Sequence, residues 1–323
     1  GANATNIYAV AVDVGDKIYV GGDFATVNGV ARRRLARLNS DGSSDATFNV
    51  GAGFLGFAEV YSIFPLASGD VLVGGNFTNY NGNDVTNLVM LTTNGGIVNG
   101  FTFGATVNGS VRAMTTNAAG TEIVIVGDFT TVNTSNNNRI ASLNLTTGAI
   151  NNNFSTDPDF GGANASVRAV LRDTAGRFYV GGDFTSIGTN TSFQRFARLN
   201  PSGNWNTPMN ATNDPTATVR ALAIDQLGRV YLGGDFVSQI FNYPNNYSFD
   251  IYRSHTYTII DDDAAVAIVT APGSPNDGSF QITRFGSTTS PLAVNFNITG
   301  TATRSADYVL RTNGIVLTAN QIT

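Results

Sequence analysis

The 323-residue chain contains no cysteine, one histidine (His255), one lysine (Lys17) and only two glutamates (Glu59 and Glu122). Without cysteine there can be no disulfide, no thiolate nucleophile and no cysteine-ligated metal. One histidine excludes a multi-histidine metal site and leaves a single base for a Ser-His-Asp relay, and His255 lies in a segment between aromatic residues. We therefore predict that the chain is not an enzyme.

Long apolar runs and basic charge are also missing. No stretch approaches the roughly 18 apolar residues that a spanning helix needs, so we expect no membrane span. The net charge of −5 argues against a nucleic-acid partner, because such proteins concentrate Lys and Arg on their binding surface. The low lysine content and the abundance of Asn, Thr and Gly favour an extracellular, cell-surface location. The chain opens with Gly1 directly before a repeat, so we expect a segment of a longer protein.

One phrase, read as Tyr-Val-Gly-Gly-Asp-Phe in two of its copies, returns five times. The copies end 52 to 55 residues apart, at Phe24, Phe77, Phe129, Phe184 and Phe236. Such a period predicts a repeat protein, in which recurring residues hold each repeat together more often than they form one active site.

Each repeat shows the same order of predicted strands. An alternating strand such as residues 7–12 is followed by a tight turn, then by the Gly-Gly-Asp-Phe strand, then by a third strand such as residues 34–39. After a second polar turn, a short outer strand is expected to end near Phe48, Phe101 and Phe154.

Four antiparallel strands in about 52 residues predict a β-propeller blade. The predicted fold is therefore all-β: a five-repeat β-propeller over residues 1–250, a linker or closing strand over 251–263, and a partial β-sandwich over 264–323. A parallel β-helix is the alternative, but its coils are usually shorter and lack a hairpin turn between every strand. The five phenylalanines are expected to be buried between blades.

Charged residues recur at matching positions. Asp23, Asp128, Asp183 and Asp235, with Asn76 in the second repeat, could ring a channel and hold cations. Asn replaces Asp in one repeat, so a negative charge is not required at this position. We therefore predict that these side chains accept hydrogen bonds from backbone N–H groups of the following turn. The arginines share a Val-Arg-Ala slot (Arg112, Arg168, Arg220) or an Ala-Arg-Leu-Asn slot (Arg37, Arg198), and ion-pair or ring-stacking roles are predicted for them.

The sequence pattern changes at the run Asp261-Asp262-Asp263. Alternating segments at 266–269, 278–284 and 292–298, broken by Pro and Gly, predict strands of a sandwich. An unfinished sandwich leaves a strand edge unpaired, so we expect completion by a strand from another chain or from the parent protein.

Both parts of the chain resemble known families. Residues 7 to about 240, with Tyr-Val-Gly-Gly-Asp-Phe and Ala-Arg-Leu-Asn followed by Asp-Gly, resemble the delta-60 tandem-repeat family of long bacterial surface proteins. That resemblance implies a propeller-like fold and no established activity. The Ile-Ile-Asp-Asp-Asp boundary and the later Gly-Thr-Ala…Asp-Tyr segment resemble a Calx-beta domain.

The Calx-beta resemblance implies a calcium site. Calx-beta domains bind Ca²⁺ through carboxylates at one end of the sandwich, and Asp261, Asp262, Asp263 and Asp307 are the ligands implied here. The sequence departs from the pattern at Ser274-Pro275-Asn276, where an acidic residue is expected, so a solvated acidic linker is the alternative reading.

The predicted function is that of a non-enzymatic extracellular surface or filament protein with a structural or adhesive role. Its expected partners are other copies of itself or other surface proteins, and glycans. The alternative is a carbohydrate-binding, lectin-like propeller, which aromatic residues at equivalent exposed positions would favour. Tyr80, Phe193 and Trp205 are too scattered to meet that condition, and a degenerate hydrolase is disfavoured by the scarcity of His and Glu.

Overall fold

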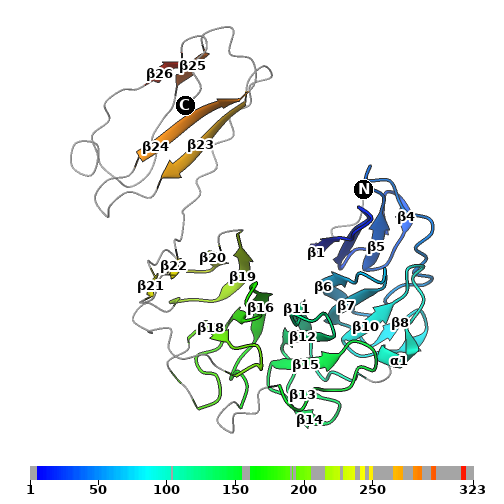
Figure 1. Cartoon of the computed structure of the whole chain (residues 1–323). Helices are drawn as coiled ribbons and strands as arrows, with labels where there is room; N and C mark the ends of the chain where they lie inside the picture. Colours follow the sequence, from blue (N-terminus) through cyan, green and yellow to red (C-terminus); the bar gives the residue numbers. More distant parts are fainter. Residues whose placement is uncertain are drawn as a thin grey trace. The chain divides into compact units, whose positions relative to one another are not determined.

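The computed structural model describes residues 6–102, 105–154, 161–189, 191, 194–204, 215–225 and 228–236, and six short strands between residues 241 and 317. The chain divides into two compact units, Gly1–Tyr252 and Arg253–Thr323. The first unit carries the repeats, whose sheets follow one another in chain order (Figure 1).

Four repeats each form a three-stranded antiparallel sheet with the Gly-Gly-Asp-Phe strand in the middle. Sheet 1 is β1 (Ile7–Val12), β2 (Ile18–Gly22) and β5 (Leu35–Leu38); sheet 2 is β6 (Glu59–Pro65), β7 (Val71–Asn76) and β10 (Leu88–Leu91); sheet 3 is β11 (Val111–Thr116), β12 (Glu122–Gly127) and β15 (Ile140–Asn144); sheet 4 is β16 (Val167–Arg172), β17 (Phe178–Gly182) and β18 (Phe196–Leu199). In the described residues sheet 5 has two strands, β19 (Val219–Ile224) and β20 (Val230–Gly234).

Smaller elements accompany these sheets. The first three repeats carry a short hairpin after the middle strand: β3 (Thr26–Val27) with β4 (Val30–Ala31), β8 (Asn79–Tyr80) with β9 (Asn83–Asp84), and β13 (Thr131–Val132) with β14 (Ser135–Asn136). A four-residue helix, α1 (Asn99–Thr102), closes the second repeat, and β21 (Phe241–Tyr243) pairs with β22 (Tyr247–Phe249). The second unit shows two antiparallel pairs, β23 (Ala265–Ala271) with β24 (Ser279–Phe285) and β25 (Leu292–Asn295) with β26 (Gly314–Leu317).

A β-bulge in every first strand explains why the second glycine of the phrase is present in all five repeats. The pairing register shifts by one residue there, for example between Ile7 and Ala9, and brings the chain close to the middle strand. A Cβ on Gly22 would lie 2.0 Å from the Asn6 carbonyl oxygen, and a Cβ on Gly127 would lie 1.9 Å from that of Ser110. Only glycine fits this approach.

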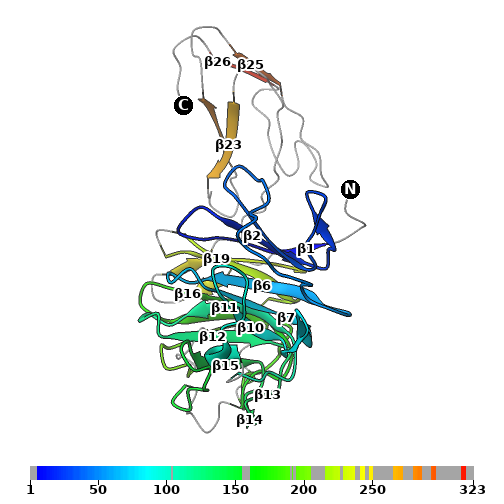
Figure 2. The same ribbon diagram turned by 90° about the vertical axis from the view of Figure 1, so that its right-hand side faces the viewer.

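The hydrophobic core lies between sheets. The first strands of consecutive sheets are neighbours, from β1 through β6, β11 and β16 to β19, and the sheets can be followed in this order in Figure 1. In the view of Figure 2, β1, β6 and β11 lie one below another. Separate buried clusters join sheet 1 to sheet 2, sheet 2 to sheet 3, sheet 3 to sheet 4 and sheet 4 to sheet 5. Each contains the valine that opens the next sheet: Val60, Val111, Val167 and Val219. Burial of apolar side chains between sheets is thus the main stabilising interaction.

The prediction of four strands per blade is wrong for the described residues. In the first three repeats the expected outer strand is reduced to a single bridge: Leu38 with Ser44, Leu91 with Ile97 and Leu143 with Ile150. Beyond the bridge, the Asp45 side chain accepts a hydrogen bond from the Thr47 amide, and the Asn151 side chain accepts one from the Asn153 amide. These local bonds turn the chain and end the strand.

The other predictions for the repeats have mixed outcomes. All five predicted strands that carry the recurring phrase are present, and Phe77, Phe129 and Phe184 are buried between sheets. Phe24 is buried within its own repeat, whereas Phe236 is only partly buried. The fold is all-β with propeller-like repeats, and its antiparallel sheets rule out the β-helix in this region. The sheets do not close into a ring, so the five-bladed propeller and the partial sandwich remain predictions.

Candidate functional site

The five bulge residues form one row along the neighbouring first strands. They are Tyr8 in β1, Tyr61 in β6, Arg112 in β11, Arg168 in β16 and Arg220 in β19, and we call them the bulge row. A bulge re-aims its extra residue away from the regular alternation of the strand. The bulge therefore gives five repeats one equivalent polar position each.

The three arginines of the bulge row pair with aspartates at the end of the middle strand of the same sheet. Arg112 binds Asp128 with Nη2–Oδ2 at 2.6 Å, and Arg168 binds Asp183 at the same distance. Arg220 and Asp235 form a more exposed pair, also at 2.6 Å. The predicted ion-pair role of these arginines is confirmed.

Two of these aspartates also connect their sheet to the next repeat. Ser166 Oγ donates to Asp128 at 2.6 Å, and Thr218 Oγ1 donates to Asp183 at 2.7 Å. Burial opposes ionisation of both carboxyls, but the arginine and hydroxyl hydrogen bonds outweigh it and lower the pKa of Asp128 and of Asp183.

The prediction that the recurring aspartates accept amides of the following turn is wrong for the described residues. Asp128, Asp183 and Asp235 accept hydrogen bonds from arginine side chains. Asp23 accepts one from the backbone amide of Asn6, which lies before the first strand of its sheet. The arginine offers a charge-assisted and partly bidentate bond, which is stronger than a neutral amide bond.

The bulge row changes character in the first two repeats. The Tyr8 hydroxyl lies 3.2 Å from Asp23 Oδ2 and 3.4 Å from Glu59 Oε1, and the Tyr61 hydroxyl donates a short hydrogen bond to Glu59 Oε2. The two tyrosine rings are 5.4 Å apart, and the Arg112 guanidinium lies 5.0 Å from the centre of the Tyr61 ring. This end of the row therefore combines two half-exposed rings with two carboxylates.

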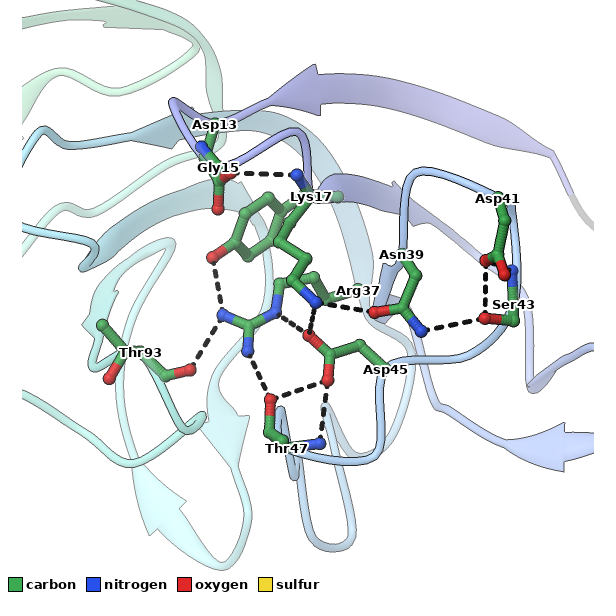
Figure 3. Close-up of polar contacts among 11 residues, drawn as sticks. Asp13, Gly15, Lys17, Arg37, Asn39, Asp41, Ser43, Asp45, Thr47 and Thr93 are labelled. Carbon is green, nitrogen blue, oxygen red and sulfur yellow. Dashed lines mark hydrogen bonds and ion pairs between the residues drawn. The ribbon is translucent and has the colours of Figure 1, made fainter.

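A second polar cluster, centred on Arg37, is buried between sheets 1 and 2 (Figure 3). Arg37 Nε donates to Asp45 Oδ2 at 2.8 Å, and Lys17 Nζ lies 3.3 Å from the same oxygen. The guanidinium also donates to the Thr93 carbonyl of the second repeat and lies 4.8 Å from the centre of the Phe48 ring. These bonds satisfy the polar groups of Arg37 and Asp45 within the protein. The cluster therefore connects the first two repeats and offers few free hydrogen-bonding groups to a ligand.

Burial opposes ionisation of Asp45, but hydrogen bonds from Thr47 and from the Arg37 guanidinium outweigh it. Together they hold the pKa of the Asp45 carboxyl below its usual range. The predicted ion-pair and ring-stacking role of Arg37 is thus confirmed.

A cavity of about 370 Å³ lies beside Arg139, between loops of the third and fourth repeats, with Gly162 and Asn164 in its lining. Arg139 Nε is buried and has no hydrogen-bond partner, whereas Nε of Arg34, which stands in the same position before the third strand, donates to the Ala58 carbonyl at 2.7 Å. The cavity could hold a small polar group, but it borders residues outside the described part of the chain.

The predicted calcium ligands Asp261, Asp262, Asp263 and Asp307 lie outside the described residues, as do His255, Phe193 and Trp205. Among the residues that the structure describes, no three His, Asp or Glu side chains gather as a metal site would need. Tyr80 is buried, and its hydroxyl donates to the Gly95 carbonyl.

Sequence reasoning missed the tyrosine end of the bulge row. Aligning Ile7-Tyr8-Ala9 and Val60-Tyr61-Ser62 with the Val-Arg-Ala slot would have placed both tyrosines in it.

None of the described helices is long and apolar enough to cross a membrane.

Comparison with known proteins supports the repeat fold. The family described as "Domain of unknown function (DUF5122) beta-propeller" matches residues 16–48, 66–97, 122–154 and 176–207. None of the curated proteins compared with this chain matches it.

Solved structures with some similarity include WD40 propellers. The WD40 β-propeller domain of Doa1 is 12% identical with a TM-score of 0.46, covering 71% of this chain and 60% of that one. The Neurospora crassa Pan2 WD40 domain is 11% identical with a TM-score of 0.39, covering 70% and 71%. A protein of unknown function from Bacteroides caccae is 12% identical with a TM-score of 0.27, covering 62% and 80%.

Proposed function

We propose that this chain is a non-enzymatic extracellular surface or filament protein with a structural or adhesive role. The observation that carries the proposal is an uncovered apolar face on sheet 1. Ile7, Val10 and Val12 of β1 are 60%, 63% and 59% exposed. Val60, Val111, Val167 and Val219, which match Ile7 in the other first strands, are fully buried against the preceding sheet.

Sheet 5 carries a face that matches the one left open on sheet 1. In sheet 4, a Cβ on Gly181 would lie 2.4 Å from Val219 Cγ1 of the next sheet. Gly233, at the same position in sheet 5, is exposed, and among the described residues a Cβ there would meet only Ala221 of its own sheet, at 3.8 Å. The chain thus presents both halves of its internal sheet-to-sheet interface at the surface.

An exposed apolar face of this kind favours association with another protein surface. The apolar face of sheet 1 fits the face of another propeller-type sheet that carries glycine and alanine. We propose a second copy of this chain as that partner, because its sheet 5 carries such a face. Extracellular location and the absence of catalysis are parts of the same proposal, supported by the scarcity of lysine, histidine and glutamate.

Sedimentation velocity at increasing protein concentration tests the assembly role. We expect concentration-dependent association of the unmodified chain and its loss in Val10→Asp, because a carboxylate cannot enter an apolar interface unpaired. Phe57→Ser is the matched control, since Phe57 is a fully exposed apolar residue outside β1, in the loop before β6. Identical sedimentation of all three proteins as monomers would contradict the proposal.

Carbohydrate binding is the second candidate, and the tyrosine end of the bulge row favours it. Tyr8 and Tyr61 occupy equivalent positions in two repeats beside carboxylates that can accept sugar hydroxyls. A glycan array that shows binding by the chain but not by Tyr8→Ala would support this candidate. Binding that is unchanged in the variant would place any glycan site elsewhere.

Calcium binding at Asp261, Asp262, Asp263 and Asp307 also remains a proposal, supported by the clustering of three carboxylates in sequence. Calorimetric titration of Ca²⁺ into the chain and into Asp262→Ala tests it. Heat that saturates in the first protein and vanishes in the second is the expected result. Equal binding by the two proteins would move the site elsewhere.

A further inference from the structure

Asp23 lacks the arginine partner that its counterparts in the later repeats have, and Glu59 adds a second carboxylate where those repeats have Ser110, Ser166 and Thr218. In repeats three, four and five, the aspartate after the middle strand is paired with the arginine of the row. In the first repeat the arginine position holds Tyr8, and in the second it holds Tyr61. Among the described residues, neither Asp23 nor Glu59 forms an ion pair with Lys or Arg.

Neutral donors bind these carboxylates but bring no positive charge: the Asn6 amide and side chain donate to Asp23, and the Tyr61 hydroxyl donates to Glu59. Tyr8 has one hydroxyl proton, yet Asp23 Oδ2 and Glu59 Oε1 both lie within 3.4 Å of its oxygen. It can donate to only one of them at a time. Two carboxylates near one hydroxyl repel each other, and a cation between them would relieve that repulsion.

The rings of this site are suited to the same kind of ligand. A cation within about 6 Å of a tyrosine ring centre is attracted to the face of the ring. The Arg112 guanidinium already occupies such a position over Tyr61, at 5.0 Å. The neighbouring Tyr8 ring is 41% exposed, so a ligand can reach it from solvent.

From these observations we propose that Asp23, Glu59, Tyr8 and Tyr61 form a binding site for an organic cation, a protonated amine or a guanidinium group. The two carboxylates supply the charge, and the two rings supply a flat apolar contact for the carbon atoms around the nitrogen. This site is separate from the uncovered apolar face of sheet 1 and goes beyond the proposed function.

The chemistry of the site favours an organic cation over a calcium ion or a neutral sugar. Calcium takes six to eight oxygen ligands from carboxylates, carbonyls and water, and phenol hydroxyls are not among its usual ligands, so the protein would supply only the two carboxylates. A neutral sugar would leave the carboxylate charges uncompensated. A protonated amine satisfies the carboxylates and packs its methylene or methyl groups on the rings.

The experiment uses the whole chain with two probes, tetramethylammonium chloride and arginine amide, at constant ionic strength set with sodium chloride. The first probe represents a free quaternary amine and the second represents a cationic side chain of a protein partner. We expect saturable shifts of the Tyr8 and Tyr61 ring resonances in NMR spectra, with a dissociation constant on the order of 1 mM for at least one probe, as suits a half-exposed ionic and ring contact. The tighter probe identifies the source of the cation.

Two charge-neutralising variants and one control test the assignment. Glu59→Gln and Asp23→Asn should each weaken binding by about fivefold or more, because each removes half of the charge. Tyr8→Phe keeps the ring and should retain binding, whereas Asp84→Asn, at an exposed position in β9, should have no effect. Urea unfolding of each variant confirms that it is folded.

The proposal is overturned if neither probe saturates the tyrosine shifts, or if folded Glu59→Gln and Asp23→Asn both bind as the unmodified chain does. Binding of neutral N-acetylglucosamine at the same resonances without binding of either cation would also overturn it and would support the carbohydrate-binding candidate instead.

Discussion

Arg37 and Asp45 show how single residues hold adjacent repeats together. The pair is buried, and its guanidinium reaches the Thr93 carbonyl of the second repeat. A buried pair adds little stability compared with apolar residues of the same shape, but removing one partner leaves an uncompensated charge. The surrounding bonds to Thr47, Tyr19 and Lys17 make that loss larger because they share the same groups.

We predict that Asp45→Asn lowers the free energy of unfolding by about 3 kcal/mol, because it leaves Arg37 buried without its counter-charge. Urea unfolding measures the difference. Asp84→Asn is the control, since its side chain is exposed and should leave the unfolding midpoint unchanged. A loss no larger than that of the control would show that water solvates Arg37.

The lowered pKa values of Asp45, Asp128 and Asp183 predict acid sensitivity. A carboxyl whose pKa is lower in the folded than in the unfolded state contributes stability above the unfolded value of about 3.9, and this contribution is lost as pH falls through the folded value.

Urea midpoints should therefore decrease progressively as the pH falls below about 5, because the unfolded chain takes up protons that these paired carboxylates do not bind in the folded state. The same series on Asp45→Asn should show a shallower decrease. Parallel slopes for the two proteins would mean that Asp45 does not contribute to the acid sensitivity.

At the scale of the strand and sheet, the two glycines of the recurring phrase have different roles. The second is required by the bulge, where the first strand comes too close for any Cβ. The first faces the valine of the next sheet, and Val126 replaces it in the third repeat without loss of burial. Packing against the neighbouring sheet therefore decides whether a side chain fits at the first glycine.

We predict that Gly181→Ala destabilises the fold by about 1–3 kcal/mol, as overpacking does, because its Cβ would lie 2.4 Å from Val219 Cγ1. Gly233→Ala is the matched control at the same position of sheet 5, where no described residue of another sheet lies within 4 Å, and it should be close to neutral. Thermal unfolding compares the two variants. Equal losses would show that Gly233 is also covered in solution.

The strands that recur in every repeat could be predicted from the sequence. The prediction failed where individual side-chain hydrogen bonds determine the backbone conformation or the ion-pair partner. The repeat period, the middle strands and the buried phenylalanines follow from the alternation of apolar residues and the positions of glycine, which are present in the sequence itself. The outer strand was mispredicted because Asp45 and Asn151 bond to nearby amides. The partners of Asp128 and Asp183 were missed because a bulge brings together residues 15 or 16 positions apart.

At the scale of the whole molecule, stability should vary along the stack of sheets. In a repeat protein each unit is stabilised mainly by its neighbours. Sheets 2, 3 and 4 have a neighbour on both faces, whereas sheets 1 and 5 have one uncovered face among the described residues.

Amide hydrogen exchange should therefore be slowest in β7, β12 and β17 and faster in β2 and β20, because end units open without unfolding the middle. Mass spectrometry of proteolytic fragments measures these rates. Uniform protection of all five strands would indicate that both end faces are covered in solution.

The valine at the start of each later sheet also bears on how such a chain changes over generations. Because Val60, Val111, Val167 and Val219 present the same side chain to the sheet before them, removing or duplicating one whole repeat joins surfaces that already match. Unequal recombination between repeats of a gene would then yield longer and shorter arrays that still fold. The number of repeats can then change during evolution without the need for a new interface between neighbouring sheets.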